Sequence, residues 1–304
     1  MAAVRAGIGA RWVGLLAVLG GAAATAADGG PAAPPPDLRV TPVPGRLGVD
    51  RFYAKHVSVG GLPVLGSAKV SDFALAEAAH LVEQMLRDRA DLRDALIAAG
   101  VRVAVMAPDE FTTDIPEHRD LTPRDRWDKR ARGLGATRRR PAVSCGEENL
   151  LGLRGDPYAG ESILIHEFAH TLHGIALAAA EPDFDGRLDR AFRAATARGL
   201  WAGTYAATNR GEYWAEGVQS YFGANRTGDR SHNRINSRRD LAEYDPDLAA
   251  LIAGVFRGAE WTYVPPARRT AKGHLEGLDA DRLPRFQWPE RLRGDPAGPP
   301  GTRQ

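Results

Sequence analysis

The sequence is poor in cysteine, in net charge and in long apolar runs. Cys145 is the single cysteine among 304 residues, so intramolecular disulfides and zinc sites built from several thiolates are excluded. The formal net charge is only +2, which gives no reason to expect a nucleic acid or another polyanion as partner. What is present is ordinary for a globular protein, because 43% of the residues are hydrophobic and can form a sizeable core.

The longest apolar stretch lies at the N-terminus, where residues 12–27 follow Arg5 and Arg11. Residues 24–26 (Ala-Thr-Ala) supply the small side chains that a signal peptidase requires. This pattern predicts a signal peptide over residues 1–27 and therefore a secreted or periplasmic protein. The alternative is an uncleaved membrane anchor, but two glycines interrupt the short apolar run. No later stretch approaches spanning length, so we expect no stable membrane insertion after the signal is removed.

The rest of the chain is predicted to contain one domain. Residues 28–48 are rich in Pro, Gly and Ala and are expected to form an extended linker. Residues 49–290 are predicted to form an α+β domain, because several helices and few strands are expected there. Residues 291–304 are rich in Pro, Gly and Arg and are expected to be a disordered tail.

Apolar spacing and capping residues place the elements of this domain. Ser71 is a good N-cap, and the apolar residues that follow predict one long helix that Gly100 ends. Alternating residues predict a strand at 101–106, and a short strand is expected at 142–144. Residues 108–140 are expected to be irregular. Four more helices are predicted at residues 161–174, 184–198, 210–221 and 240–256.

The predicted helix at residues 161–174 contains the motif H-E-x-x-H, formed by His166, Glu167 and His170. Residues four apart project from one helical face, so the two imidazoles can bind the same zinc ion. Glu167 is then placed to take a proton from a zinc-bound water, whose pKa the ion lowers. The alternative is a buried histidine pair without a metal. The apolar residues that precede His166 argue against it, because a core helix must provide partners for its polar groups.

Catalytic zinc needs a third protein ligand. His173 is not expected to be that ligand, because three ligands from two turns of one helix converge poorly on one ion. The metzincin pattern also fails, since it requires Gly at position 173 and His at position 176, where this chain has Ala176. Better candidates are Glu212 and Glu216, one turn apart on a helix that Asn209 can cap. One carboxylate would bind the metal and the other would accept the free N–H of a ligating histidine. An exposed acidic helix face is the alternative.

H-E-F-A-H followed by Y-x-x-T-N-x-x-E-Y-W-A-E resembles the gluzincin metallopeptidases, most closely the catalytic domain of anthrax lethal factor and its relatives. The resemblance covers residues 163–222. It implies a zincin-like domain with a zinc-binding active-site helix and a mostly helical C-terminal part. It also implies that His166, His170 and Glu212 bind Zn²⁺, that Tyr205 stabilises the oxyanion and that Glu216 orients a ligand.

The predicted function is therefore that of a secreted zinc metallopeptidase with a peptide or protein substrate. The absence of a G-x-M-x-N segment of the aminopeptidase type favours an endopeptidase. Two alternatives stay open: an exported zinc-binding module without proteolytic activity, and a zinc hydrolase of non-peptide amides. By analogy with gluzincin folds, residues 142–144 are the expected edge strand that binds the substrate main chain. Cys145, Tyr213 and Trp214 are expected to be packing residues.

Overall fold

The structure is a computed structural model that describes residues 38–130 and 132–293, so the predicted signal peptide lies outside the described residues. Six strands in this part of the chain form one mixed sheet, in the order β1-β2-β3-β4-β6-β5. The strands are Thr41–Pro42 (β1), Lys55–Val59 (β2), Leu62–Gly66 (β3), Arg102–Met106 (β4), Gly133–Leu134 (β5) and Ala142–Gly146 (β6).

The sheet combines a hairpin with a parallel centre. β2 and β3 are antiparallel, and the turn between them uses Gly60 and Gly61, which both have positive φ. β3, β4 and β6 are parallel, and β5 is antiparallel to β6. Because β6 pairs with a strand on each side, the expectation that residues 142–144 form the edge strand is wrong. The edge on this side of the sheet is β5.

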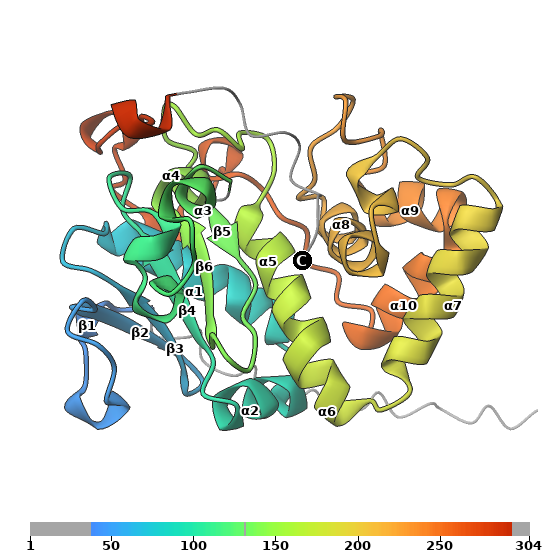
Figure 1. Cartoon of the computed structure of the whole chain (residues 1–304), viewed down its shortest axis with the longest axis horizontal. Coiled ribbons are helices and arrows are strands. Elements are labelled where there is room, and N and C mark those ends of the chain that lie inside the picture. The colour runs from blue at the N-terminus through green and yellow to red at the C-terminus, as the bar shows by residue number, and fades with distance from the viewer. Residues whose placement is uncertain (1–37, 131, 294–304) are drawn as a thin grey trace, which may run out of the picture. The chain divides into compact units, whose positions relative to one another are not determined.

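Ten α-helices accompany the sheet in the described part of the chain, and the predicted α+β fold with a mostly helical C-terminal part is confirmed. Figure 1 shows the sheet on one side of α5 and helices α7 to α10 on the other. The helices are α1 Asp72–Leu86, α2 Ala90–Ala98, α3 Arg124–Arg130, α4 Glu147–Leu151, α5 Ile163–Thr171, α6 Ala178–Ala180, α7 Phe184–Ala197, α8 Arg210–Phe222, α9 Arg238–Tyr244 and α10 Pro246–Val255.

Two helices that the sequence predicts as continuous are divided. Ser71 caps α1 as predicted, but the chain turns before α2, where buried Arg89 binds Asp91 and Glu181. The predicted helix at 240–256 is divided into α9 and α10, and Pro246 is the first residue of α10. Proline suits a first helical position because it has no backbone N–H to leave unpaired there.

The predicted helix at residues 161–174 is also longer than expected. Gly174 does not end it, because α5 continues through a π-helical segment, Leu172–Leu177, into α6. By length and composition alone the run Ile163–Ala180 could cross a membrane, which contradicts the expectation that no later stretch approaches that length. However, 61% of this run is buried inside the protein, as in a core helix, so it is weak evidence for a membrane span.

The folded region extends beyond both predicted domain boundaries. Residues 41–42, placed in the predicted linker, form β1 and pair with β2. At the other end, Leu292 is buried, and Arg291 pairs with Asp125 and Asp128 of α3. Residues on both sides of the predicted boundaries at 49 and 290 therefore also contact this domain.

Candidate active site

Helix α5 is fixed at its N-terminus by side chains of its own connection. Ser162 is the N-cap, and its hydroxyl accepts a hydrogen bond from the Ile165 N–H. Asn149 on α4 reinforces this start: its Oδ1 accepts from the Ile163 N–H at 2.8 Å, and its Nδ2 donates to the Glu161 carbonyl at 2.9 Å. The position of the H-E-x-x-H helix is thus determined by capping interactions rather than by apolar packing alone.

The edge strand β5 lies directly against α5, and two glycines make this approach possible. A Cβ on Gly133 would lie 2.4 Å from a methyl carbon of Ile163, and a Cβ on Gly135 would lie 2.9 Å from the Cβ of His170. Just beyond, the Ala136 N–H donates to the Thr171 hydroxyl at 2.9 Å. The edge of the sheet is therefore held beside the H-E-x-x-H motif.

Helix α8 brings the downstream motif to the same place. Asn209 caps α8 as predicted, since its side chain accepts from the Gly211 and Glu212 N–H groups. One turn later, fully buried Trp214 donates its indole N–H to the Ala169 carbonyl of α5 at 2.9 Å. This contact sets α8 against α5, so Glu212 faces the two histidines of the motif.

The three predicted ligands come together in a small triangle. His166 Nε2 and His170 Nε2 are 3.1 Å apart, and each lies 3.1 Å from Glu212 Oε2. These residues form a group that could hold a metal ion. A tetrahedral zinc ion with bonds of about 2.0–2.1 Å separates its ligand atoms by roughly 3.3 Å, so the triangle has a suitable size.

A hydrogen bond that the sequence analysis missed orients His166. Its Nδ1 lies 2.7 Å from Gln219 Oε1, and the Gln219 amide nitrogen donates to the Ser162 carbonyl at 3.1 Å. Because that second bond turns Oε1 of Gln219 toward His166, Nδ1 must carry the proton. In neutral His166 the lone pair of Nε2 is then directed into the triangle, as a metal ligand requires.

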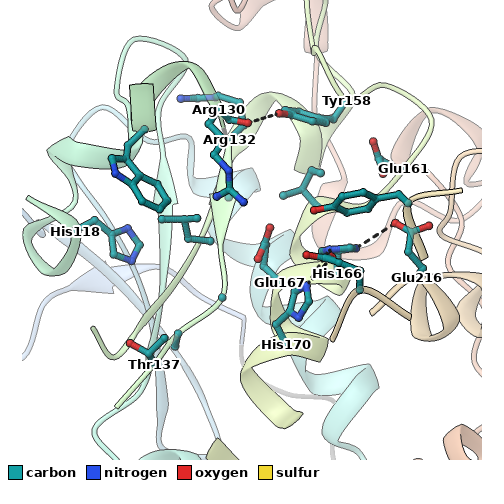
Figure 2. Close-up of a pocket in the computed structure, with 18 of the residues that line it drawn as sticks. His118, Arg130, Arg132, Thr137, Tyr158, Glu161, His166, Glu167, His170 and Glu216 are labelled. Carbon is teal, nitrogen blue, oxygen red and sulfur yellow. Dashed lines mark hydrogen bonds and ion pairs between the residues drawn. The ribbon is translucent and has the colours of Figure 1, made fainter. Parts of the chain in front are cut away.

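Glu216 was predicted to accept the free N–H of a ligating histidine, and the structure gives that contact to Gln219. Glu216 Oε1 is 3.6 Å from His166 Nδ1, beyond hydrogen-bond distance. Its other oxygen accepts from Asn225 Nδ2 at 3.0 Å, and His232 Nε2 lies 3.8 Å from Oε1. Burial raises the pKa of Glu216. Figure 2 shows Glu216 beside His166, with a dashed line that marks this longer ion pair.

The charges around the triangle favour a cation. Burial lowers the pKa of His166, but its hydrogen bond with Glu212 and the charges of three carboxylates outweigh burial and raise it to about 10. The pKa of Glu212 falls despite burial, because it contacts both histidines. Without a metal ion, His166 is therefore protonated and donates a hydrogen bond from Nε2 to the Glu212 carboxylate. A divalent metal ion could take the place of that proton and bind all three side chains.

Glu167 and Tyr205 complete the predicted site. Both line a cavity of about 800 Å³ together with the triangle. The Tyr205 ring is stacked on that of His166, with ring centroids 6.2 Å apart and the planes inclined by 24°. Burial, together with the charges of Glu212 and Glu167, raises the pKa of the Tyr205 hydroxyl, so it stays protonated at neutral pH. In Figure 2, Glu167 points into the cavity between the histidines and the opposite wall.

The opposite wall of the cavity was not predicted from the sequence. It comes mainly from the segment that was expected to be irregular, which forms α3 and β5. This segment matches no motif and has no strand-like alternation, so neither α3 nor β5 could be placed at the cavity from the sequence. The cavity residues from this wall include His118, Trp127, Arg130 and Arg132.

The remaining candidates lie away from the triangle. His173 Nε2 contacts Asp185 at 2.7 Å. Cys145 is fully buried in β6, where burial raises the pKa of its thiol, and it does not line the cavity. Tyr213 and Trp214 are fully buried, as expected of packing residues.

Comparison with known proteins gives little further information. No protein-family model and no curated protein matches the sequence. A solved structure that matches is the PRO-PRO endopeptidase (PPEP-2) from Paenibacillus alvei, with 18% sequence identity and a TM-score of 0.37. The match covers 63% of this chain and 95% of that chain.

Proposed function

We propose that the chain is an exported zinc metallopeptidase that cleaves within peptide chains and uses the gluzincin ligand set. The observation that carries the proposal is the 3.1 Å triangle of His166, His170 and Glu212, with Glu167 facing the same cavity. The export part of the proposal rests on the N-terminal sequence pattern alone.

In this proposal each polar side chain has a distinct task. His166, His170 and Glu212 hold zinc, which when bound lowers the pKa of water and polarises a carbonyl. Glu167 accepts the proton of the attacking water and passes it to the leaving amine. The Tyr205 hydroxyl donates a hydrogen bond to the oxygen on which negative charge develops.

The form of the cavity supports a peptide rather than a small amide as substrate. The consecutive residues 133–137, which include the edge strand β5, line the cavity beside Glu167. An unpaired strand edge can bind an extended peptide through main-chain hydrogen bonds. A peptide added to β5 would therefore be led past the candidate base.

The proposal is tested by metal analysis and by digestion of a peptide library with the purified mature protein. We expect about one zinc ion per chain, loss of cleavage with a chelator and recovery with added zinc. Full activity without metal would overturn the proposal. Zinc binding without cleavage of any peptide would favour the binding module, and cleavage of other amides alone would favour the non-peptide hydrolase.

The ligand assignment is tested by two carboxylate variants. Glu212→Ala should abolish zinc binding, because it removes one of three ligands. Glu216→Ala should weaken zinc binding by no more than about ten- to a hundredfold, as changes behind the ligands do. If Glu216→Ala abolished binding while Glu212→Ala left it intact, the assignment taken from the gluzincin resemblance would be wrong.

A further inference from the structure

Four arginines line the cavity, and three of them are already neutralised by carboxylates. Arg132 pairs with Glu148, Arg140 pairs with Asp120, and Arg226 pairs with Glu161. The fourth, Arg130, has no carboxylate partner within residues 38–130 and 132–293. One cation in the wall is therefore left free to bind an anion from outside the protein.

Arg130 is held in a defined position. Its guanidinium lies over the ring of Trp127, with Cζ 5.3 Å from the ring centroid. Its own carbonyl accepts a hydrogen bond from the Tyr158 hydroxyl at 3.1 Å, which fixes the backbone at the end of α3 (Figure 2). Stacking uses the face of a guanidinium and leaves its in-plane N–H groups available. Those groups match the two oxygens of a carboxylate.

Arg130 lies near the candidate reaction site. Arg130 and Tyr205 line the same cavity. An anion bound at Arg130 would thus lie in the same cavity as the oxyanion donor.

The edge strand explains how a substrate would reach this residue. Side chains alternate between the two faces of a strand. A peptide paired with β5 would direct one set of side chains toward α5 and the other set toward the wall that carries Trp127 and Arg130. A side chain of the second set would meet a stacked, unneutralised guanidinium.

We propose that Arg130, supported by Trp127, is a specificity-determining residue that binds an aspartate or glutamate side chain of the peptide substrate. This inference rests on the proposed peptidase function and adds a substrate class to it. The enzyme would then cut peptides at a fixed distance from an acidic residue.

The test is digestion of a peptide library by the zinc-loaded wild type, by Arg130→Glu and by the control Arg126→Glu. Arg126 is exposed on the same helix and does not line the cavity, so its variant makes the same charge change outside the site. The wild type and Arg126→Glu should enrich Asp or Glu at one position near the cleaved bond. Arg130→Glu should lose that preference and favour Lys or Arg there.

Matched peptides give the size of the effect. Replacing the preferred Asp or Glu by Asn or Gln should lower wild-type kcat/KM by about ten- to a hundredfold, the range for a hydrogen bond between charged groups. In Arg130→Gln the two peptides should be cleaved equally. Thermal unfolding shows whether the Arg130 variants are folded, and the glutamine variant serves if Arg130→Glu is not.

The two proposals fail in different ways. If the wild type cleaves peptides without an acidic preference, or if both Arg130 variants keep that preference, the inference is overturned and the peptidase proposal stands. If the zinc-loaded wild type cleaves no peptide, both are overturned.

Discussion

Two clusters in the protein pair a carboxylate with nitrogen-containing side chains: Arg132 with Glu148, and His166 and His170 with Glu212. They differ in how many of their polar atoms are bound within the protein. In the first, Arg132 lies 2.6 Å (Nε–Oε1) and 3.0 Å (Nη2–Oε2) from Glu148, and both side chains are 0% exposed. The guanidinium also donates to the Ala107 and Glu110 carbonyls. The rings of Phe111 and Phe286 lie 5.3 and 4.6 Å from its Cζ atom. Four of the five N–H groups of the guanidinium are thus engaged within the protein.

In the second cluster, two imidazole nitrogens and one carboxylate oxygen, from His166, His170 and Glu212, face one another. The three atoms lie 3.1 Å apart, and Gln219 fixes the proton of His166 on the far nitrogen. The cluster opens into a cavity, and the His170 side chain is 24% exposed. The difference indicates that the first cluster holds the fold together, whereas the second could hold a metal ion.

The largest expected effect separates activity from stability in the second cluster. Glu167→Gln should lower activity by about 10²- to 10⁴-fold, because an amide cannot accept the proton of the attacking water. Its zinc content and thermal unfolding should match the wild type, because Glu167 is not one of the ligands. Steady-state kinetics beside metal analysis provide the test. A variant that keeps its activity would remove Glu167 from the mechanism.

The converse is expected for the first cluster. Arg132→Met should lower the free energy of unfolding by about 3–5 kcal/mol, because it leaves the Glu148 carboxylate buried without a partner. The double variant Arg132→Met/Glu148→Leu should regain much of this loss, since no buried charge then remains. Denaturant unfolding of the two variants and the wild type measures both values. If the single variant were as stable as the wild type, the cluster would not hold the fold together.

Local signals in the sequence predicted the parts of the site that lie within one helix. The H-E-x-x-H spacing, the Asn209 cap and the strand near residues 102–106 all depend on neighbours a few positions away. Gln219 could have been found in the same way. It follows Glu212 by seven residues, or two helical turns, and so shares its face. The Gly60-Gly61 pair between two apolar runs likewise indicates a β-hairpin, which could have been predicted from the sequence.

The opposite wall could not be predicted, because long-range packing builds it. Strand β5 has two residues, one of them glycine, and its position is set by its fit against α5 and its pairing with β6. The cavity wall that includes Trp127 and Arg130 depends on this packing. The spacing of apolar residues in the sequence does not indicate contacts between segments so far apart.

Within the active cluster, Tyr205→Phe should have an intermediate effect. The variant should keep zinc, because Tyr205 is not one of the three ligands. It should lose about 2–3 kcal/mol of transition-state stabilisation, the scale of one oxyanion donor, which lowers kcat by on the order of a hundredfold. Steady-state kinetics measure kcat and KM separately. A change confined to KM would show instead that Tyr205 only binds substrate.

The smallest expected effect decides which side chain orients His166. Gln219→Met removes the acceptor at similar volume, so the proton of Nδ1 loses its partner and the correct tautomer is no longer enforced. Zinc affinity should fall by about ten- to a hundredfold. Glu216→Gln should change the affinity less, because Glu216 Oε1 lies 3.6 Å from His166 Nδ1, against 2.7 Å for Gln219 Oε1. Chelator competition measures both affinities, and circular dichroism confirms that the variants are folded. If the glutamate variant lost more affinity than the glutamine variant, the orienting role would belong to Glu216, as the sequence first indicated.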